Sequence, residues 1–330
     1  MQNGQDVAPT AAPVPDLIVL IEQANTRIYG LVQRTPVAQL LCDRRIPPST
    51  HVYAKLEQLQ PTGSFKLRGA TNKILSLTPD AASAGVVASS TGNHGLAVAA
   101  AARHRGIDAE VFLSTQVPEA KWEKIASYGA RIRIVGQNPL EAEIAARVAA
   151  AESARTYISP YNDWEVIAGQ GTIGVELARQ LESIDAVFIA TGGGGLISGV
   201  GTYLRKRYPH TEIVGCWPQN SRVLYECLRT GKVIDFPEDY TLSESTAGGV
   251  EPGSITFELT RAAMHRGVLV LEDAVLDAMK WARERNWTIE GAAGVALAAF
   301  FQEAARYDGK TVVVLLCGGN LSPEVQRRMQ

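Results

Sequence analysis

One lysine and one run of glycines in this sequence are residue types that can hold a small molecule between them. Lys66 lies in the segment 63–70, GSFKLRGA, and the run GGGGL at 192–196 follows the apolar segment 186–190. A lysine amine can bind an aldehyde as a Schiff base. Glycine-rich backbone ahead of a helix can present several N–H groups to a phosphate. Together they indicate pyridoxal phosphate, an aldehyde that carries a phosphate, and therefore amino-acid chemistry.

The surroundings of both features strengthen this interpretation, because most lysines are only solvated surface charges. Lys66 follows a turn-forming segment, PTGS, and precedes a helix that we expect to begin near Arg68. The adjacent Phe65 is apolar and can help to desolvate the amine, which lowers its pKa and makes it a nucleophile and base. A tight turn needs one or two glycines, not four. The glycine run at 192–195 does not itself form a G-x-G-x-x-G, which weakens a dinucleotide-binding interpretation of this loop.

Two further strings lie where a strand is expected to end. The segment 89–95, SSTGNHG, joins an expected strand to an expected helix, and a helix N-terminus of this kind suits a carboxylate, although a plain capped loop has the same composition. The segment 315–320, LLCGGN, places Cys317 at the carboxyl end of a strand, where ligands of parallel sheets bind. Cys317 could face a cofactor, or it could be a buried structural cysteine.

Composition narrows the class of protein. The chain has 330 residues, of which 46% are hydrophobic and 20% charged, as in an ordinary soluble globular protein. The formal net charge of −2 gives no reason to expect nucleic acid or an anionic membrane as a partner, and the apolar runs are too short to span a bilayer. The four cysteines show no C-x-x-C spacing, so we expect no zinc site and a reducing cytoplasm.

Strand-like and helix-like segments alternate along most of the chain, which is typical of parallel sheets covered by helices. The expected strands are 51–56, 85–89, 109–113, 131–135, 186–190, 212–216, 268–271 and 311–316, and the expected helices include 94–105, 119–128, 140–152, 172–182 and 273–285. We predict an α/β fold with two open, mostly parallel sheets, because so many strands crowd a single sheet. Residues 78–157 are expected to form a small inserted domain, and residues 1–77 with 158–330 a large one, with the ligand in the cleft between them.

These strings, taken in order, resemble the fold-type II pyridoxal-phosphate enzymes, whose fold is that of the tryptophan synthase β-subunit. The resemblance extends from about Leu31 to Leu321 and is strongest to the branch of serine and threonine dehydratases (ammonia-lyases) with serine racemase. The segment 166–172, VIAGQGT, also matches that branch. The sulfhydrylase branch of the fold lacks the His94-Gly95 pair, which disfavours a β-substitution synthase.

The resemblance implies a role for each matching residue. Lys66 is the catalytic Schiff-base lysine. The cofactor-binding positions are Phe65, Lys66, Asn93, Gly192, Gly193, Gly194, Gly195, Leu196, Gly249, Glu290 and Cys317. The substrate-binding positions are Ser90, Thr91, Gly92 and Asn93. A homodimer is also implied by the resemblance alone.

The implied activity is the α,β-elimination of an L-β-hydroxy-α-amino acid to a 2-oxo acid and ammonia. Lys66 would take the Cα proton. A thiol at Cys317 is a weak, neutral partner for the ring nitrogen, which stabilises a carbanion less than an aspartate would and so favours elimination. L-Threonine and L-serine are the conventional substrates. L-Phenylserine is an alternative, because Tyr161, Trp164 and Trp217 lie near site-forming segments, although they could equally be core residues.

Two departures from the pattern of the branch bear on the activity. Some relatives bind a divalent cation through an acidic residue just after the strand that ends in Cys216, where this chain has Trp217, so we expect no metal. Thr91 stands where the racemases have a serine that acts opposite the lysine; its extra methyl group stiffens χ1 and makes racemisation the weaker alternative. A cofactor-carrying sensor without catalysis is a further alternative, disfavoured by the intact Lys66 and Asn93.

Overall fold

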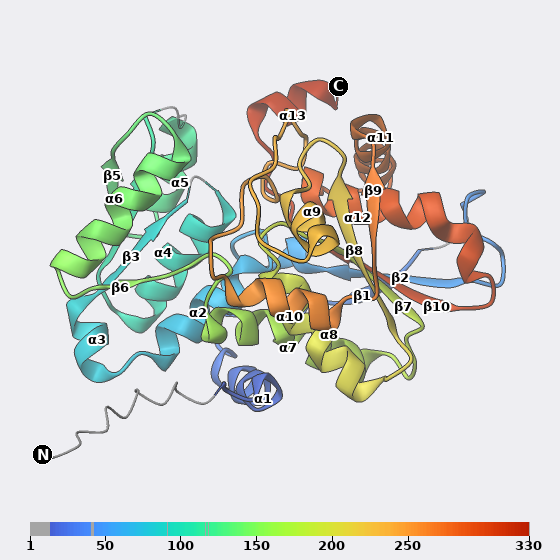
Figure 1. Ribbon diagram of the computed structural model, residues 1–330, viewed down its shortest axis with the longest axis horizontal. Helices are drawn as coiled ribbons and strands as arrows, with labels where there is room; N and C mark the ends of the chain where they lie inside the picture. The colour runs from blue at the N-terminus through green and yellow to red at the C-terminus, as the bar shows by residue number, and fades with distance from the viewer. Residues whose placement is uncertain (1–13, 41–42, 91, 116, 118, 330) are drawn as a thin grey trace, which may run out of the picture.

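The computed structural model describes residues 14–40, 43–90, 92–115, 117 and 119–329 and contains two sheets (Figure 1). The larger sheet has the strand order β1-β2-β10-β7-β8-β9, and all neighbouring strands are parallel except β1 and β2. Its strands are β1 Val37–Gln39, β2 His51–Leu56, β7 Ala186–Ala190, β8 Glu212–Pro218, β9 Arg266–Val270 and β10 Thr311–Leu316. The central strands β7 and β10 are almost continuously buried, as expected for strands covered on both faces.

The smaller sheet lies at the left of Figure 1 and has the order β5-β4-β3-β6, with all strands parallel. Its strands are β3 Val86–Ser89, β4 Ala109–Leu113, β5 Arg131–Ile134 and β6 Thr156–Tyr157, and its helices are α3 Pro79–Ala84, α4 Asn93–Arg105, α5 Glu119–Ala126 and α6 Pro139–Glu152. Alternate residues of β3 face opposite sides, so Val86 and Ala88 pack with α4 while Val87 packs with α6.

The remaining helices cover the larger sheet. They are α1 Leu17–Arg27, α2 Lys66–Ser76, α7 Trp164–Gln180, α8 Gly195–Arg207, α9 Val223–Thr230, α10 Ile255–Ala263, α11 Glu272–Arg283, α12 Gly291–Glu303 and α13 Pro323–Arg328, with short 3-10 turns at η1 Glu57–Leu59 and η2 Ala304–Tyr307. The apolar helix α12 packs against β7, β8, β9 and β10. Helices α7 and α8 pack against each other in the lower part of Figure 1. Helix α2 packs against both α7 and α4.

The predicted α/β class with two mostly parallel sheets is confirmed. Each predicted strand is present with small shifts at its ends, and the smaller sheet uses only strands from the segment 78–157. We therefore propose the boundaries 78–157 and 1–77 with 158–330 as the division into two domains. Two short strands, β1 and β6, were not anticipated.

The structure corrects the start of two helices. Helix α7 begins at Trp164 instead of near Thr172, and α2 begins at Lys66 instead of near Arg68. The glycines of α7 serve close packing: a Cβ at Gly169 would lie 2.6 Å from the Arg68 carbonyl oxygen. Tertiary contact between α2 and α7 therefore outweighs the low helix propensity of glycine.

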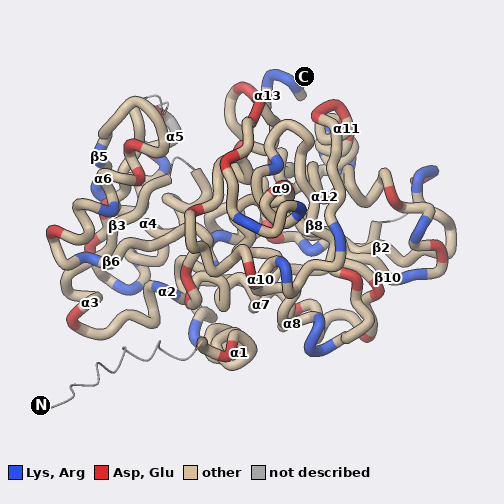
Figure 2. Tube along the Cα trace, in the orientation of Figure 1, with Lys and Arg blue, Asp and Glu red and all other residues tan. Residues whose placement is uncertain are grey.

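Over the described part of the chain, lysine and arginine are interspersed with aspartate and glutamate, apart from short basic stretches at the ends of α8 and α13 (Figure 2). Within the described ranges, no helix has both the length and the apolar character that a membrane span requires.

Candidate active site

The sequence segments that contain the candidate reactive and binding residues meet at the carboxyl ends of the parallel strands. Gly192 follows β7, Cys317 follows β10, and Ser90 follows β3. The Phe65 N–H donates to the Cys317 carbonyl oxygen at 3.0 Å, and Ser64 forms an isolated bridge with Gly318. These contacts fix the start of α2, which carries Lys66, beside the end of β10.

A cavity opens at this place and collects most of the predicted cofactor site. Its lining includes the predicted residues Phe65, Lys66, Gly192, Gly193, Gly194, Gly195, Leu196, Glu290 and Cys317. It also includes residues without a predicted role in cofactor binding, namely Tyr161, Ala190, Thr191, Ile197, Ser245, Thr246 and Ala292. The lysine and the glycine loop, 126 positions or more apart in the sequence, thus face one cavity.

The Lys66 amine is held ready for reaction. Its Nζ donates a hydrogen bond to the Pro160 carbonyl oxygen at 2.8 Å and lies 5.2 Å from the centre of the Phe65 ring. Burial lowers the pKa of Lys66 to about 8, an effect that Cys317 and Glu290 partly oppose. Near neutral pH the unprotonated fraction of this amine is therefore much larger than that of an ordinary lysine, as a nucleophile and a base require.

The glycine loop presents unpaired N–H groups at the start of α8. No N–H group of residues 192–197 donates a backbone hydrogen bond to an acceptor in the described part of the chain. Gly194 has a φ of +86°, and a Cβ on Gly193 would lie 2.6 Å from the Tyr161 ring. Side chains are therefore excluded where the loop meets the protein, and the free N–H groups with the positive end of the helix dipole suit a dianion.

Cys317 and Glu290 are the titratable groups, besides Lys66 and Tyr161, that line the cavity. Burial raises the pKa of the Cys317 thiol well above its usual value, so this group is neutral at physiological pH. Burial also raises the pKa of Glu290, although hydrogen bonds from Ser245 and Asn93 oppose this effect. The Ser245 hydroxyl donates to Glu290 Oε1 at 2.6 Å.

Asn93 lies next to Glu290 and is not part of the cavity lining. Its Nδ2 donates to both carboxylate oxygens of Glu290, at 2.8 and 3.0 Å, and its Oδ1 accepts a bond of 2.7 Å from Asn320. A hydrogen bond from Asn93 to a cofactor oxygen therefore requires Nδ2 to leave Glu290. Asn320 also accepts a bond from Lys124 of α5 at 3.0 Å, so the chain of amides joins the smaller sheet's helices to the larger sheet.

The predicted substrate loop is only partly described. Ser90 Oγ accepts the Gly92 N–H at 3.3 Å, and both residues are partly exposed at the N-terminus of α4, outside the cavity lining. Thr91 lies outside the described residues. Gly249 is exposed and is not part of the lining, so its contact with a cofactor stays a prediction.

Of the three aromatic residues considered for the substrate pocket, one lines the cavity and two lie elsewhere. Tyr161 lines the cavity, whereas Trp164 packs with α1 residues and Trp217 is 1% exposed within another apolar cluster. In the described ranges, no group of three or more His, Cys, Asp or Glu side chains is placed to hold a metal ion. The absence of a cation beside Trp217 stays a prediction.

The residues around the cavity fit pyridoxal phosphate. An amine of lowered pKa can bind its aldehyde, unpaired backbone N–H groups can bind its phosphate, and Phe65 and Cys317 can contact its ring. Residues 28–318 match the family described as "Pyridoxal-phosphate dependent enzyme", and the chain belongs to that family. The cofactor is therefore pyridoxal phosphate.

Relatives with a described activity lie within the same family. The catabolic L-threonine dehydratase of Staphylococcus aureus is 34% identical over 305 residues, which cover 91% of this chain and 88% of the relative. Threonine deaminase isoform 2 of Solanum lycopersicum, in its processed form, has a similar structure with a TM-score of 0.89 and 28% identity, covering 98% of this chain and 95% of the other. Maize serine racemase has a TM-score of 0.86 and 30% identity, covering 94% and 95%.

The pKa of Lys66 predicts how the apoprotein takes up its cofactor. Only the unprotonated amine can attack the aldehyde, and a lowered pKa means that this form increases as the pH rises through about 8. The rate of reconstitution with pyridoxal phosphate should therefore reach half its maximum near pH 8. Stopped-flow absorbance measures this rate. The same measurement with a small free amine in place of the protein corrects for the ionisation of the cofactor itself. A midpoint above pH 10, where ordinary lysines titrate, would contradict the prediction.

Proposed function

We propose that this protein is a dehydratase of L-β-hydroxy-α-amino acids, of the L-threonine and L-serine type, that releases a 2-oxo acid and ammonia. The observation that carries the proposal is the placement of the Lys66 amine, of pKa about 8, in one cavity with the unpaired glycine loop and the neutral Cys317 thiol. The L-threonine dehydratase and threonine deaminase among the relatives support the same reaction class.

Each part of the site has a task in this reaction. Bound pyridoxal phosphate supplies the aldehyde that captures the substrate amine and the ring that withdraws electrons from Cα. The N–H groups of residues 192–197 hold the phosphate, and Lys66, once free, takes the proton from Cα. We assign the binding of the substrate carboxylate to Ser90, Thr91, Gly92 and Asn93, because the N-terminus of α4, which begins at Asn93, is suited to an anion.

The thiol of Cys317 directs the outcome. A neutral thiol would not donate a strong charge-assisted hydrogen bond to the ring nitrogen of a bound cofactor, so negative charge on Cα would be stabilised only modestly. A hydroxyl on Cβ then offers the easier path: the Cα–H and Cβ–O bonds break, water leaves, and the enamine product is hydrolysed to the 2-oxo acid and ammonia. This reasoning favours elimination over racemisation.

The substrate side chain is the finer part of the proposal. Of the three aromatic residues considered for a β-aryl pocket, only Tyr161 lines the cavity, and its ring packs against the glycine loop. We therefore favour L-threonine and L-serine over L-phenylserine.

The test is the release of 2-oxo acid by the purified holoenzyme from L-serine, L-threonine and L-threo-phenylserine in EDTA. We expect a higher kcat/KM for L-serine or L-threonine than for L-threo-phenylserine, and no stimulation of the rate by magnesium. Preference for phenylserine would assign a β-aryl substrate and contradict the proposed side-chain preference. Racemised serine without oxo acid, or turnover only with an added thiol, would replace the dehydratase by a racemase or a β-synthase.

We also propose that the enzyme is a homodimer, on the basis of the motif resemblance, and that it is cytoplasmic, on the basis of its cysteine pattern. Light scattering coupled to gel filtration should give twice the chain mass of 35.5 kDa. The mass of a single chain at micromolar concentration would contradict the dimer.

A further inference from the structure

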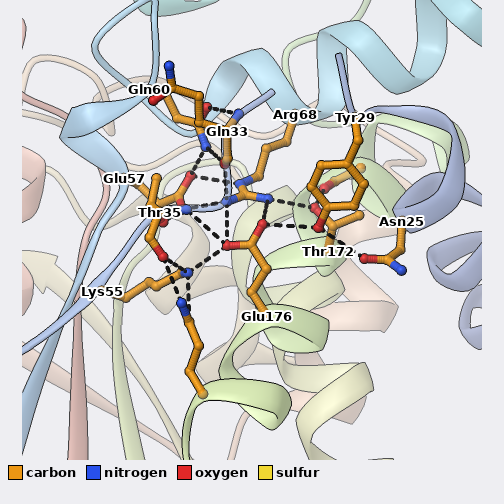
Figure 3. A network of polar contacts seen from close by, with 12 residues as sticks. Asn25, Tyr29, Gln33, Thr35, Lys55, Glu57, Gln60, Arg68, Thr172 and Glu176 are labelled. Atoms are coloured by element: carbon orange, nitrogen blue, oxygen red, sulfur yellow. Dashed lines mark hydrogen bonds and ion pairs between the residues drawn. The ribbon is translucent and has the colours of Figure 1, made fainter. Parts of the chain in front are cut away.

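Four charged side chains are buried together behind Lys66. Lys55 of β2, Glu57 of η1, Arg68 of α2 and Glu176 of α7 are each between 0% and 3% exposed (Figure 3). We call these four residues the buried charge cluster. Its two cations and two carboxylates balance, which is the condition under which charges are tolerated in a protein interior.

Arg68 lies between the two carboxylates of the cluster, as Figure 3 shows. Its Nε and Nη2 both donate to Glu57 at 2.7 Å, and its Nη1 and Nη2 donate to Glu176 at 2.7 and 3.0 Å. Nη1 also donates to Thr172 Oγ1 at 3.1 Å. The planar guanidinium is therefore held in one orientation by paired contacts, which a lysine ammonium cannot reproduce.

The position of Arg68 in α2 relates the cluster to the reactive amine. Helix α2 begins at Lys66, and its N-cap residue makes no side-chain capping bond. Successive helical residues are about 100° apart around the axis, so positions two apart lie on nearly opposite sides. Lys66 faces the cavity, and Arg68 faces the buried charge cluster. The first turn of α2 is thus anchored from the side opposite the amine.

The cluster also connects this turn to the strands that carry the cavity. Lys55 Nζ donates to Glu176 at 2.6 Å and to the Thr35 carbonyl oxygen at 2.7 Å. Lys55 belongs to β2, where it pairs with Leu315 of β10, and Cys317 follows the end of β10. The buried charge cluster and Cys317 are therefore connected through the paired strands β2 and β10.

We propose that Arg68 is a positioning residue for Lys66, and that the buried charge cluster sets the distance and direction of the Lys66 amine relative to bound pyridoxal phosphate. Stability alone explains the cluster poorly, because well-packed apolar residues often replace buried ion pairs without loss. The effect of the cluster on the reaction rate rests on the proposed dehydratase function, whereas its effect on the bound cofactor does not.

The test replaces Arg68 by lysine, which keeps the charge and removes the paired contacts. A misplacement of about 1 Å costs on the order of 100-fold in rate, so we expect kcat for L-threonine or L-serine to fall by about 10- to 100-fold with little change in KM. The pH midpoint of the visible band of bound pyridoxal phosphate should shift by at least about half a unit. The affinity for the cofactor should stay close to that of the wild type, because the glycine loop is untouched.

The control is Asn72→Ala on the same helix. Asn72 is buried and binds Glu165 of α7 through Nδ2, at 2.7 and 2.8 Å, so its loss weakens the docking of α2 far from Lys66. This variant should lose stability in urea yet keep the kcat and the pH midpoint of the wild type. If Arg68→Lys is not recovered folded, Glu57→Gln, which preserves shape and removes one charge contact, is measured in the same way.

The outcomes separate the explanations. A fall in kcat with a shifted midpoint in Arg68→Lys or Glu57→Gln, but not in Asn72→Ala, supports the positioning role. Wild-type values in the cluster variant, or equal changes in Asn72→Ala, would overturn it and leave a purely structural cluster. If the wild type turns over no β-hydroxy amino acid, the dehydratase proposal fails while the midpoint still decides the role of Arg68.

Discussion

Replacing Lys66 by alanine should abolish 2-oxo acid release from L-threonine and L-serine. Lys66 is the amine that faces the cavity, with its pKa lowered to about 8 by burial, and the proposed reaction uses it both to bind the cofactor and to take the Cα proton. Loss of a general base costs about 100- to 10,000-fold, and loss of the covalent link adds to this. Initial rates at saturating substrate, with absorbance spectra of the bound cofactor, measure both effects.

A second lysine of the same helix provides the control. Lys73 is 20% exposed and forms an ion pair of 2.6 Å with Asp163, away from the cavity lining. Lys73→Ala should keep the visible band and most of the activity, since this ion pair lies away from the cavity and ion pairs near the surface contribute little to stability. Turnover of a β-hydroxy amino acid by Lys66→Ala at a rate near that of Lys73→Ala would refute the assigned role.

Alanine at Gly194 should cost most of the affinity for pyridoxal phosphate. The φ of Gly194 is +86°, where an L side chain is strained, and its Cβ would lie 2.5 Å from Thr260 Oγ1. The loop must shift, and the N–H groups of residues 192–197 then lose their alignment with the phosphate. Loss of about 2–4 kcal/mol of charge-assisted hydrogen bonding raises the dissociation constant roughly 30- to 1,000-fold. Titration of the apoprotein with cofactor measures this change.

Gly231 offers a matched comparison. It has a φ of +76° at the end of α9, and a Cβ there meets nothing within 4 Å. Gly231→Ala therefore introduces the same kind of backbone strain, of about 1 kcal/mol or more, without a clash and away from the cavity. It should lower thermal stability yet bind the cofactor like the wild type. Equal losses of affinity in both variants would show that global destabilisation, not the glycine loop, is responsible.

Much of the fold could be predicted from the sequence because its signals are local. The strand β10 is the continuous apolar run TVVVLL, a pattern that is typical of a strand buried on both faces. The first turns of α7 are not evident from the sequence, because glycine has a low helix propensity, whereas the contacts of Gly169 with α2 and of Gly171 with α1 and α8 are tertiary. The strands β1 and β6 are too short to leave a periodic pattern.

The cavity residues divide in the same way. The lysine, the glycine loop and Cys317 stand in distinctive strings at the ends of strands, and the structure brings them together. The Pro160 carbonyl that binds Lys66 has no signature in the sequence, because any residue has a carbonyl. The buried charge cluster is equally hidden. Lys55 and Glu176 look like ordinary surface charges until β2 and α7 pack together.

Borohydride reduction followed by peptide mass mapping tests most directly whether Lys66 carries the cofactor. Reduction converts a Schiff base into a stable secondary amine, so the lysine that holds pyridoxal phosphate retains the added mass of the phosphopyridoxyl group after digestion. The purified holoenzyme should carry one phosphopyridoxyl group per chain, on the peptide that contains Lys66. Labelling of a different lysine, such as Lys124, which donates a hydrogen bond to Asn320, would contradict the site assignment. So would the absence of label in a protein that contains the cofactor.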